Sequence, residues 1–154
     1  MAINAQKVIV GGIAAGIVMN VLGFLGQGML LGARMNAEMD AVVPGLSQRM
    51  MTGATIAVNV ITQLVIGVLL VWLYAAMRPR FGPGFKTAAY AALVIWLCGL
   101  LFYSGWYLTG MMLASTYVFV SLVALVTLLA GAYVGGMLYK EEGAGAPSMA
   151  SARV

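Results

Sequence analysis

This sequence contains no histidine, a single cysteine and only four acidic residues among its 154 residues. Without histidine, the chain lacks the commonest general base and a frequent ligand of zinc and haem iron. Cys98 has no second cysteine with which to form a disulfide, a redox pair or a cysteine metal site. We therefore predict that the protein is not an enzyme and has no catalytic residue, no metal site and no cofactor of its own.

Charge is also absent from four long apolar runs. These runs cover about Val8–Ala33, Thr52–Met77, Thr87–Leu108 and Ala114–Tyr139, and none contains Asp, Glu, Lys, Arg or His. Each run reaches the ~20 apolar residues that a helix needs to cross the bilayer core. Charged residues make up 8% of the chain, against about 25% in soluble domains. The sequence predicts an all-α integral membrane protein, a four-transmembrane-helix bundle with short loops, in one domain over residues 1–140.

The basic residues are distributed unevenly around these spans. Four spans place both termini and the 78–86 loop on one side of the membrane. Six of the eight basic residues fall on that side: Lys7, Arg78, Arg80, Lys86, Lys140 and Arg153. The other side holds Arg34 and Arg49. Because basic residues accumulate in cytoplasmic loops, we predict a multi-pass protein of the bacterial cytoplasmic (inner) membrane with both termini in the cytoplasm.

The same distribution argues against a nucleic-acid partner, since the basic residues flank the spans and form no separate basic patch. Residues 141–154 are rich in glycine, alanine and serine. This composition predicts a disordered cytoplasmic tail.

Two connections carry local signals. In the 34–51 loop, Met35 and Met39 recur at helical spacing opposite Arg34 and Glu38. This pattern predicts a short helix that ends at Pro44-Gly45 and that lies on the membrane surface, caps the bundle or contacts a partner. In the 78–86 loop, Pro79 and Pro83 are expected to stop the second span.

Side-chain amides mark one stripe on each of the first two spans. The first stripe combines small and amide residues: Gly12, Gly16, Asn20, Gly23 and Gln27. The second stripe is polar throughout: Thr52, Thr55, Asn59, Thr62 and Gln63. An unpaired amide in hydrocarbon is costly, so we expect all four amides to be buried from lipid against another helix or another protein. Two hypotheses stay open: hydrogen bonds between helices, or a polar lining for a solute path.

Small residues also recur on the third and fourth spans. The third places Ala91, Cys98 and Gly105 seven apart, and Cys98 is expected to act as a small packing residue. The fourth carries Gly131 and Gly135, which let helices approach closely. Because a four-helix bundle can cover only part of so much small-residue surface, we expect Gly131 and Gly135 to be left for a neighbouring protein.

Aromatic residues gather where the spans end. At the predicted inner ends these are Trp72, Tyr74, Tyr90 and Tyr139. Amphipathic rings favour the depth of the membrane interface, which makes them membrane anchors. The alternative hypothesis is an aromatic cluster that faces a ligand.

The first span carries Lys7-Val-Ile-Val-Gly-Gly-Ile-Ala-Ala-Gly16, followed by Asn20-x-x-Gly23-Phe24. This segment resembles the start of short four-span bacterial membrane proteins of unknown function. The resemblance covers mainly the first span and the overall layout. It implies a four-span fold and no particular activity.

Close-packing stripes without any embedded charge favour a protein that acts by contact. We predict an accessory subunit of a larger membrane complex of the respiratory or photosynthetic type. Its partners would be membrane lipids and other integral membrane subunits, and a bound lipid or the pigment of a neighbouring subunit is compatible with such a role. The alternative is a small channel or uncoupled carrier with an amide-lined path.

Overall fold

The computed structural model describes residues 3–139, so the predicted disordered tail lies outside the described residues. These residues form helices and no strand: α1 (Ala5–Gly23), the π-helix η1 (Phe24–Leu30), α2 (Gly32–Val42), α3 (Leu46–Met50), α4 (Gly53–Phe81), α5 (Phe85–Leu108) and α6 (Ala114–Leu138). Four stretches are long and apolar enough to span a membrane, namely Ala5–Leu30, α4, α5 and α6. The predicted fold, an all-helical bundle of four membrane-spanning helices, is confirmed.

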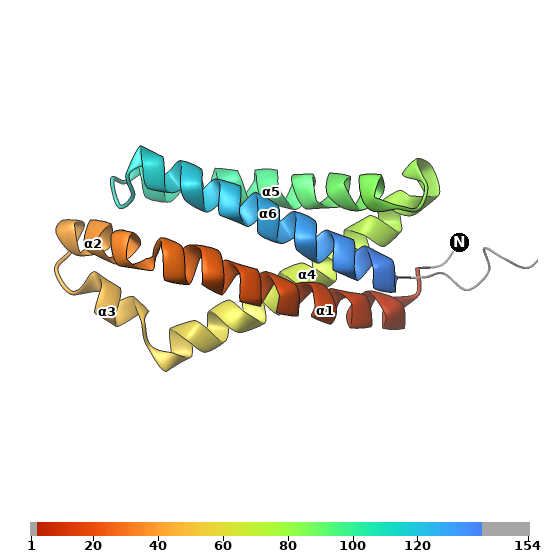
Figure 1. Ribbon diagram of the computed structural model, residues 1–154, viewed down its shortest axis with the longest axis horizontal. Coiled ribbons are helices and arrows are strands. Elements are labelled where there is room, and N and C mark those ends of the chain that lie inside the picture. The colour runs from red at the N-terminus through yellow and green to blue at the C-terminus, as the bar shows by residue number, and fades with distance from the viewer. Residues whose placement is uncertain (1–2, 140–154) are drawn as a thin grey trace, which may run out of the picture.

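The long helices run roughly along one axis (Figure 1). We call one end of the bundle the termini end, because α1 begins there, α4 passes into α5 there and α6 ends there. The opposite hairpin end holds α2, α3 and the turn between α5 and α6. Helix α1 packs against both α4 and α6, and α5 packs mainly against α6. Both described chain ends thus lie on the same side of the bundle as the 78–86 loop.

The first span ends differently from the expected Val8–Ala33. Its last seven residues, Phe24–Leu30, form a π-helix, and a new α-helix begins at Gly32. A π-helix winds more residues into each turn than an α-helix does. The ~100° spacing that places Gln27 on the first stripe therefore does not continue through this segment.

The second span also ends differently, because Pro79 does not stop it. Helix α4 continues through Pro79 to Phe81, and the Gly82 N–H closes the last turn on the Arg78 carbonyl at 2.9 Å. Proline removes one intrahelical hydrogen bond and crowds the carbonyl four residues earlier, but Pro79 is only two residues from the helix end, so little helix follows the distortion. The actual turn is made by Gly82 and Gly84, whose φ angles of 81° and 125° suit glycine.

Glycines set the contact between α1 and α4. A Cβ built on Gly67 would lie 2.3 Å from the Gly12 carbonyl oxygen and 2.6 Å from the Gly16 nitrogen. A Cβ on Gly12 would lie 2.4 Å from the Val68 Cα. The two backbones therefore touch directly, as small-residue motifs in membrane helices allow. Gly12 and Gly16 are packing residues, and Gly23 lies at the same interface, 3.6 Å from the Gln63 amide nitrogen by the same construction.

The expectation that Gly131 and Gly135 are left for a neighbour is wrong. Both are buried, and they face α1 inside the bundle. A Cβ on Gly131 would lie 2.8 Å from the Met19 side chain, and one on Gly135 would lie 2.4 Å from the Val71 side chain. Their surface is covered within the bundle, because α1 packs closely against both α4 and α6 and each of these helices presents small residues to it.

On α5, in contrast, two of the three small residues of the stripe are exposed. Ala91 is completely buried, but Cys98 is exposed, and a Cβ on Gly105 would meet nothing within 4 Å. Cys98 is therefore exposed in the single chain, and its interpretation as a packing residue is wrong. The reason is that α5 loses its neighbour α4 toward the hairpin end, where the two helices diverge (Figure 1).

Candidate functional site

Asn20 joins α1 to α4. Its half-buried side-chain amide donates to the carbonyl of Gly16 on its own helix at 2.9 Å and to the carbonyl of Val60 on α4 at 3.3 Å. Gln63 lies at the same interface, beside Gly23. The structure therefore brings Asn20, Gly23 and Gln63 together where the first two spans pack.

Asn59 lies elsewhere. It is exposed, and its side-chain N–H group donates to the Thr55 carbonyl one turn earlier on α4, at 3.0 Å. The Thr55 and Thr52 hydroxyls are also linked to each other, at 2.9 Å. Asn59 thus makes no hydrogen bond to a second helix within residues 3–139. Gln27, in the π-helix, is half-buried and makes no side-chain hydrogen bond to a described residue.

Polar residues at the start of α4 lie on one side, which we call the polar face of α4. Its members are the N-cap Thr52, the half-buried Thr55, and the exposed Asn59 and Thr62. Leu70 belongs to the same side of the helix, since it follows Asn59 by about three helical turns. Leu70 is completely buried, whereas Asn59 is exposed. One continuous helix face is therefore covered by the bundle near the termini end and uncovered near the hairpin end.

The divergence of the helices explains this change. Near the termini end α4 contacts both α5 and α6, which cover Leu70 and Tyr74. Toward the hairpin end α4 leans away from the other long helices, while α5 stays beside α6 (Figure 1). The uncovered part of this face carries Asn59 and threonine hydroxyl groups, whereas the covered part carries Leu70. This match between polarity and exposure makes the polar face the best candidate for a functional surface.

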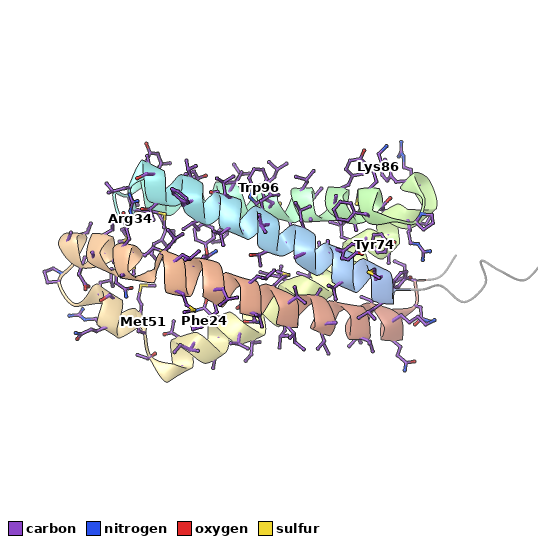
Figure 2. All side chains as sticks on the ribbon, viewed as in Figure 1. Phe24, Arg34, Met51, Tyr74, Lys86 and Trp96 are labelled. Atoms are coloured by element: carbon purple, nitrogen blue, oxygen red, sulfur yellow. The ribbon has the colours of Figure 1, made fainter. Side chains whose placement is uncertain are left out.

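At the hairpin end, α2 is fixed to the start of α6. Arg34 donates to Glu38 at 2.9 Å and to the Ser115 hydroxyl at 2.6 Å, and it lies in Figure 2 beside the first turn of α6. Glu38 accepts from the Thr116 hydroxyl at 2.6 Å and from the Leu113 N–H at 3.0 Å. The 34–51 segment thus forms the expected short helix, and that helix caps the bundle.

The carboxyl group of Glu38 is held in its charged form. Burial by itself raises its pKa, but the hydrogen bonds from Thr116, Leu113 and Arg34 and the positive charge of Arg34 outweigh burial and lower it. The sequence analysis missed this role of Glu38. One signal was present: Leu113, which precedes α6, has no side chain that can cap a helix, so the first N–H groups of α6 are open to a carboxylate from another segment.

Asp40 shapes the same segment at the hairpin end. It accepts from the Ser47 hydroxyl at 2.6 Å and from the Ser47 N–H at 2.9 Å, which closes the turn between α2 and α3. These hydrogen bonds lower the pKa of the Asp40 carboxyl. Gly45, with a φ of 76°, supplies the left-handed residue of the turn, so the short helix ends where Pro44-Gly45 predicts.

Taken together, these side chains can donate and accept hydrogen bonds, but they assemble no acid–base pair within the membrane. Within residues 3–139, no three residues of the types His, Cys, Asp and Glu lie close enough together to hold a metal ion. No protein-family model, curated protein or solved structure matches this chain.

Proposed function

We propose that this small integral membrane protein is a non-catalytic accessory subunit of a larger membrane complex, and that the polar face of α4 receives a transmembrane helix of its partner. The observation that carries the proposal is the contrast between Leu70 and Asn59. They lie on one side of one helix, yet the first is buried and the second is exposed. A second protein that continued the cover provided by α5 and α6 would bury Asn59 as well.

The chemistry of the face defines the partner. The amide oxygen of Asn59 receives no hydrogen bond from a described residue, and one N–H is used within α4 itself. A helix with small residues at the contact and a serine, threonine, asparagine or glutamine side chain would approach closely and pair with this amide. Each such bond contributes about 1 kcal/mol in membrane proteins. Partners of this kind include the integral subunits of respiratory or photosynthetic complexes, with lipid or a neighbour's pigment at the edges.

A channel or uncoupled carrier is the second candidate, and Gln63 favours it. This amide makes no hydrogen bond to a described residue and lies near the polar face, so two copies could enclose a polar path between them. Toward the termini end, however, the same side of α4 is closed by Leu70 and Tyr74, which are 0% and 4% exposed. A path along α4 would require this packed part of the bundle to open, which supports the docking hypothesis over the channel.

The test compares two substitutions to leucine in adjacent residues. Asn59→Leu removes the amide, and Val58→Leu changes an apolar side chain that lies about a quarter-turn from Asn59 and is 63% exposed. After mild extraction and native electrophoresis, we expect wild type and V58L to run in a larger assembly and N59L to run as a folded monomer. The proposal is wrong if wild type runs alone and makes liposomes permeable to a specific solute.

A further inference from the structure

A cavity of about 340 Å³ lies at the termini end, where α4, α5 and α6 meet. Its volume is within the usual range of small-molecule sites. The wall is largely aromatic and apolar and includes one guanidinium group; the residues used below are Tyr74, Arg78, Phe85, Tyr133, Met137 and Tyr139. Figure 2 shows Tyr74 at this end of the bundle, with Lys86 nearby on α5. The cavity is separate from the polar face of α4.

The guanidinium group is held in place by aromatic rings. The Arg78 Cζ atom lies 5.6 Å from the centre of the Tyr139 ring and 6.0 Å from that of Tyr74. Both tyrosines are almost completely buried, and their rings meet edge to face with centres 6.1 Å apart. A guanidinium group fixed in this way presents a planar set of donors that matches the oxygens of a phosphate.

The start of α5 adds positive potential to the same cavity. Gly84 precedes the 24-residue helix, caps it with no side chain, and lies in the cavity wall. Its N–H donates to the Tyr74 hydroxyl oxygen at 3.2 Å, which leaves the Tyr74 O–H free to donate to a ligand. The first turn of α5 contains no acidic residue, and Arg78 adds its positive charge to the cavity wall. The cavity is therefore suited to an anion.

The mouth of the cavity is apolar and faces outward. Phe85, Tyr133 and Met137 are each more than half exposed, and the Phe85 and Tyr133 rings meet edge to face at 5.9 Å. Phe85 begins α5, Met137 lies in the last turn of α6 and Tyr133 lies one turn earlier, near the level where a membrane-spanning helix meets the lipid headgroups. A free inorganic anion would gain nothing from this apolar rim, whereas an amphiphile would use both parts.

We propose that this cavity binds one phospholipid with an anionic headgroup. The lipid phosphate accepts hydrogen bonds from Arg78 and Tyr74 near the start of α5. The glycerol and the first carbons of the acyl chains lie against Phe85 and Met137, which continue into the hydrocarbon region. The aromatic cluster at this end then serves as the wall of a ligand site in addition to anchoring the helices.

The matched pair Arg78→Gln and Arg80→Gln tests the proposal. Each removes one positive charge from the same helical turn, but Arg80 is exposed, lies over the Phe81 ring and is outside the cavity wall. The full-length protein is equilibrated with phosphatidylglycerol or with phosphatidylcholine, and retained lipid is counted by native mass spectrometry. We expect one retained phosphatidylglycerol, preferred about tenfold over phosphatidylcholine, in wild type and R80Q, and about tenfold weaker retention in R78Q.

Gly136→Leu provides a test that leaves Arg78 unchanged. A Cβ at Gly136 meets its neighbours at 3.5 Å or more, so the backbone accepts a side chain in this cavity wall, and circular dichroism checks that the larger leucine leaves the fold intact. We expect this variant to lose the retained lipid as well. The proposal is overturned if R78Q and R80Q reduce retention equally, if G136L retains the lipid, or if excess inorganic phosphate displaces it, since that last result would identify a simple anion site.

Discussion

Glu38 accepts a hydrogen bond of 2.6 Å from the Thr116 hydroxyl, across 78 residues of sequence. With the Leu113 N–H and Arg34, this contact fixes the helix that follows the first span to the beginning of the last span. A carboxylate at a helix N-terminus interacts favourably with the helix dipole. The hairpin end of the bundle is therefore closed by a polar contact in a protein that has few charges.

The first prediction concerns this contact. Glu38→Gln should loosen α2 from α6 by about 1 kcal/mol, or about fivefold in hydrogen-exchange protection of α2, because the capping charge is lost. The folded state lowers the pKa of Glu38 from its ordinary value of 4.5. Its contribution is thus fully present above that pH and is lost as the pH falls through the lowered pKa. Exchange of the α2 peptide, followed by mass spectrometry at several pH values, measures both effects.

Arg49→Gln is the control, because Arg49 lies in the same segment at the hairpin end and makes none of the contacts around Glu38. Asp40 titrates in the same acidic range and faces Ser47, so protection is compared for the α2 and α3 peptides separately. A pH dependence of α2 that persisted unchanged in E38Q would show that another group controls this contact.

The second prediction concerns the contact between α1 and α4. Gly67→Ala should destabilise the bundle by about 1–3 kcal/mol, because its Cβ would meet backbone atoms of α1 that cannot move aside locally. Gly99→Ala on α5 meets nothing within 4 Å and should be neutral or stabilising by up to about 1 kcal/mol. Unfolding in mixed micelles with increasing SDS compares the two. Equal stability of the two variants would contradict the close approach of these helices.

The third prediction concerns the glycines of α6. Gly135→Leu should unfold the protein itself, because a Cβ there lies 2.4 Å from Val71 and 3.1 Å from the Gly11 carbonyl oxygen. Gly136→Ala, in the next residue, should fold normally, since its nearest contact would be 3.5 Å. Size-exclusion chromatography and circular dichroism in detergent distinguish these outcomes. A folded G135L monomer that had lost only a larger assembly would support an external role for this glycine.

The fourth prediction concerns orientation. The chain begins and ends its membrane crossings at the same end of the bundle (Figure 1), and six of the eight basic residues fall on that side in the sequence. We expect a reporter fused after Tyr139 to be active only in a cytoplasmic form, and one inserted in the Pro44-Gly45 turn only in a periplasmic form. Activity in the reverse pattern would overturn the orientation.

Local sequence determined most of the fold. The apolar runs predicted the four spans within a few residues, since their length and hydrophobicity need no tertiary information. The spacing of Met35 and Met39 similarly predicted the short helix before Pro44. The errors arose where a local rule depends on context: Pro79 is tolerated in the last turn of a helix, and the π-helix changes the spacing at Gln27.

The candidate surface could be predicted only in part. The pattern identified Asn20 and Asn59 as equivalent members of two stripes, but only the packed bundle shows that the first bonds to α4 and the second is exposed. The same limit applies to Gly135 and Gly105, which look alike in sequence and are buried and open in the structure. Sequence fixes which face of a helix a residue occupies, whereas the neighbouring helix decides whether that face is covered.

Membrane insertion and composition are thus properties of the sequence by itself, because transfer into hydrocarbon depends on each segment's own side chains. Contacts between distant segments depend on the tertiary structure. The distance in sequence between Glu38 and Thr116, or between Arg78 and Tyr139, gives no hint that they meet. In hydrocarbon the hydrophobic effect does not distinguish one helix pairing from another, so close packing and a few polar contacts select the arrangement.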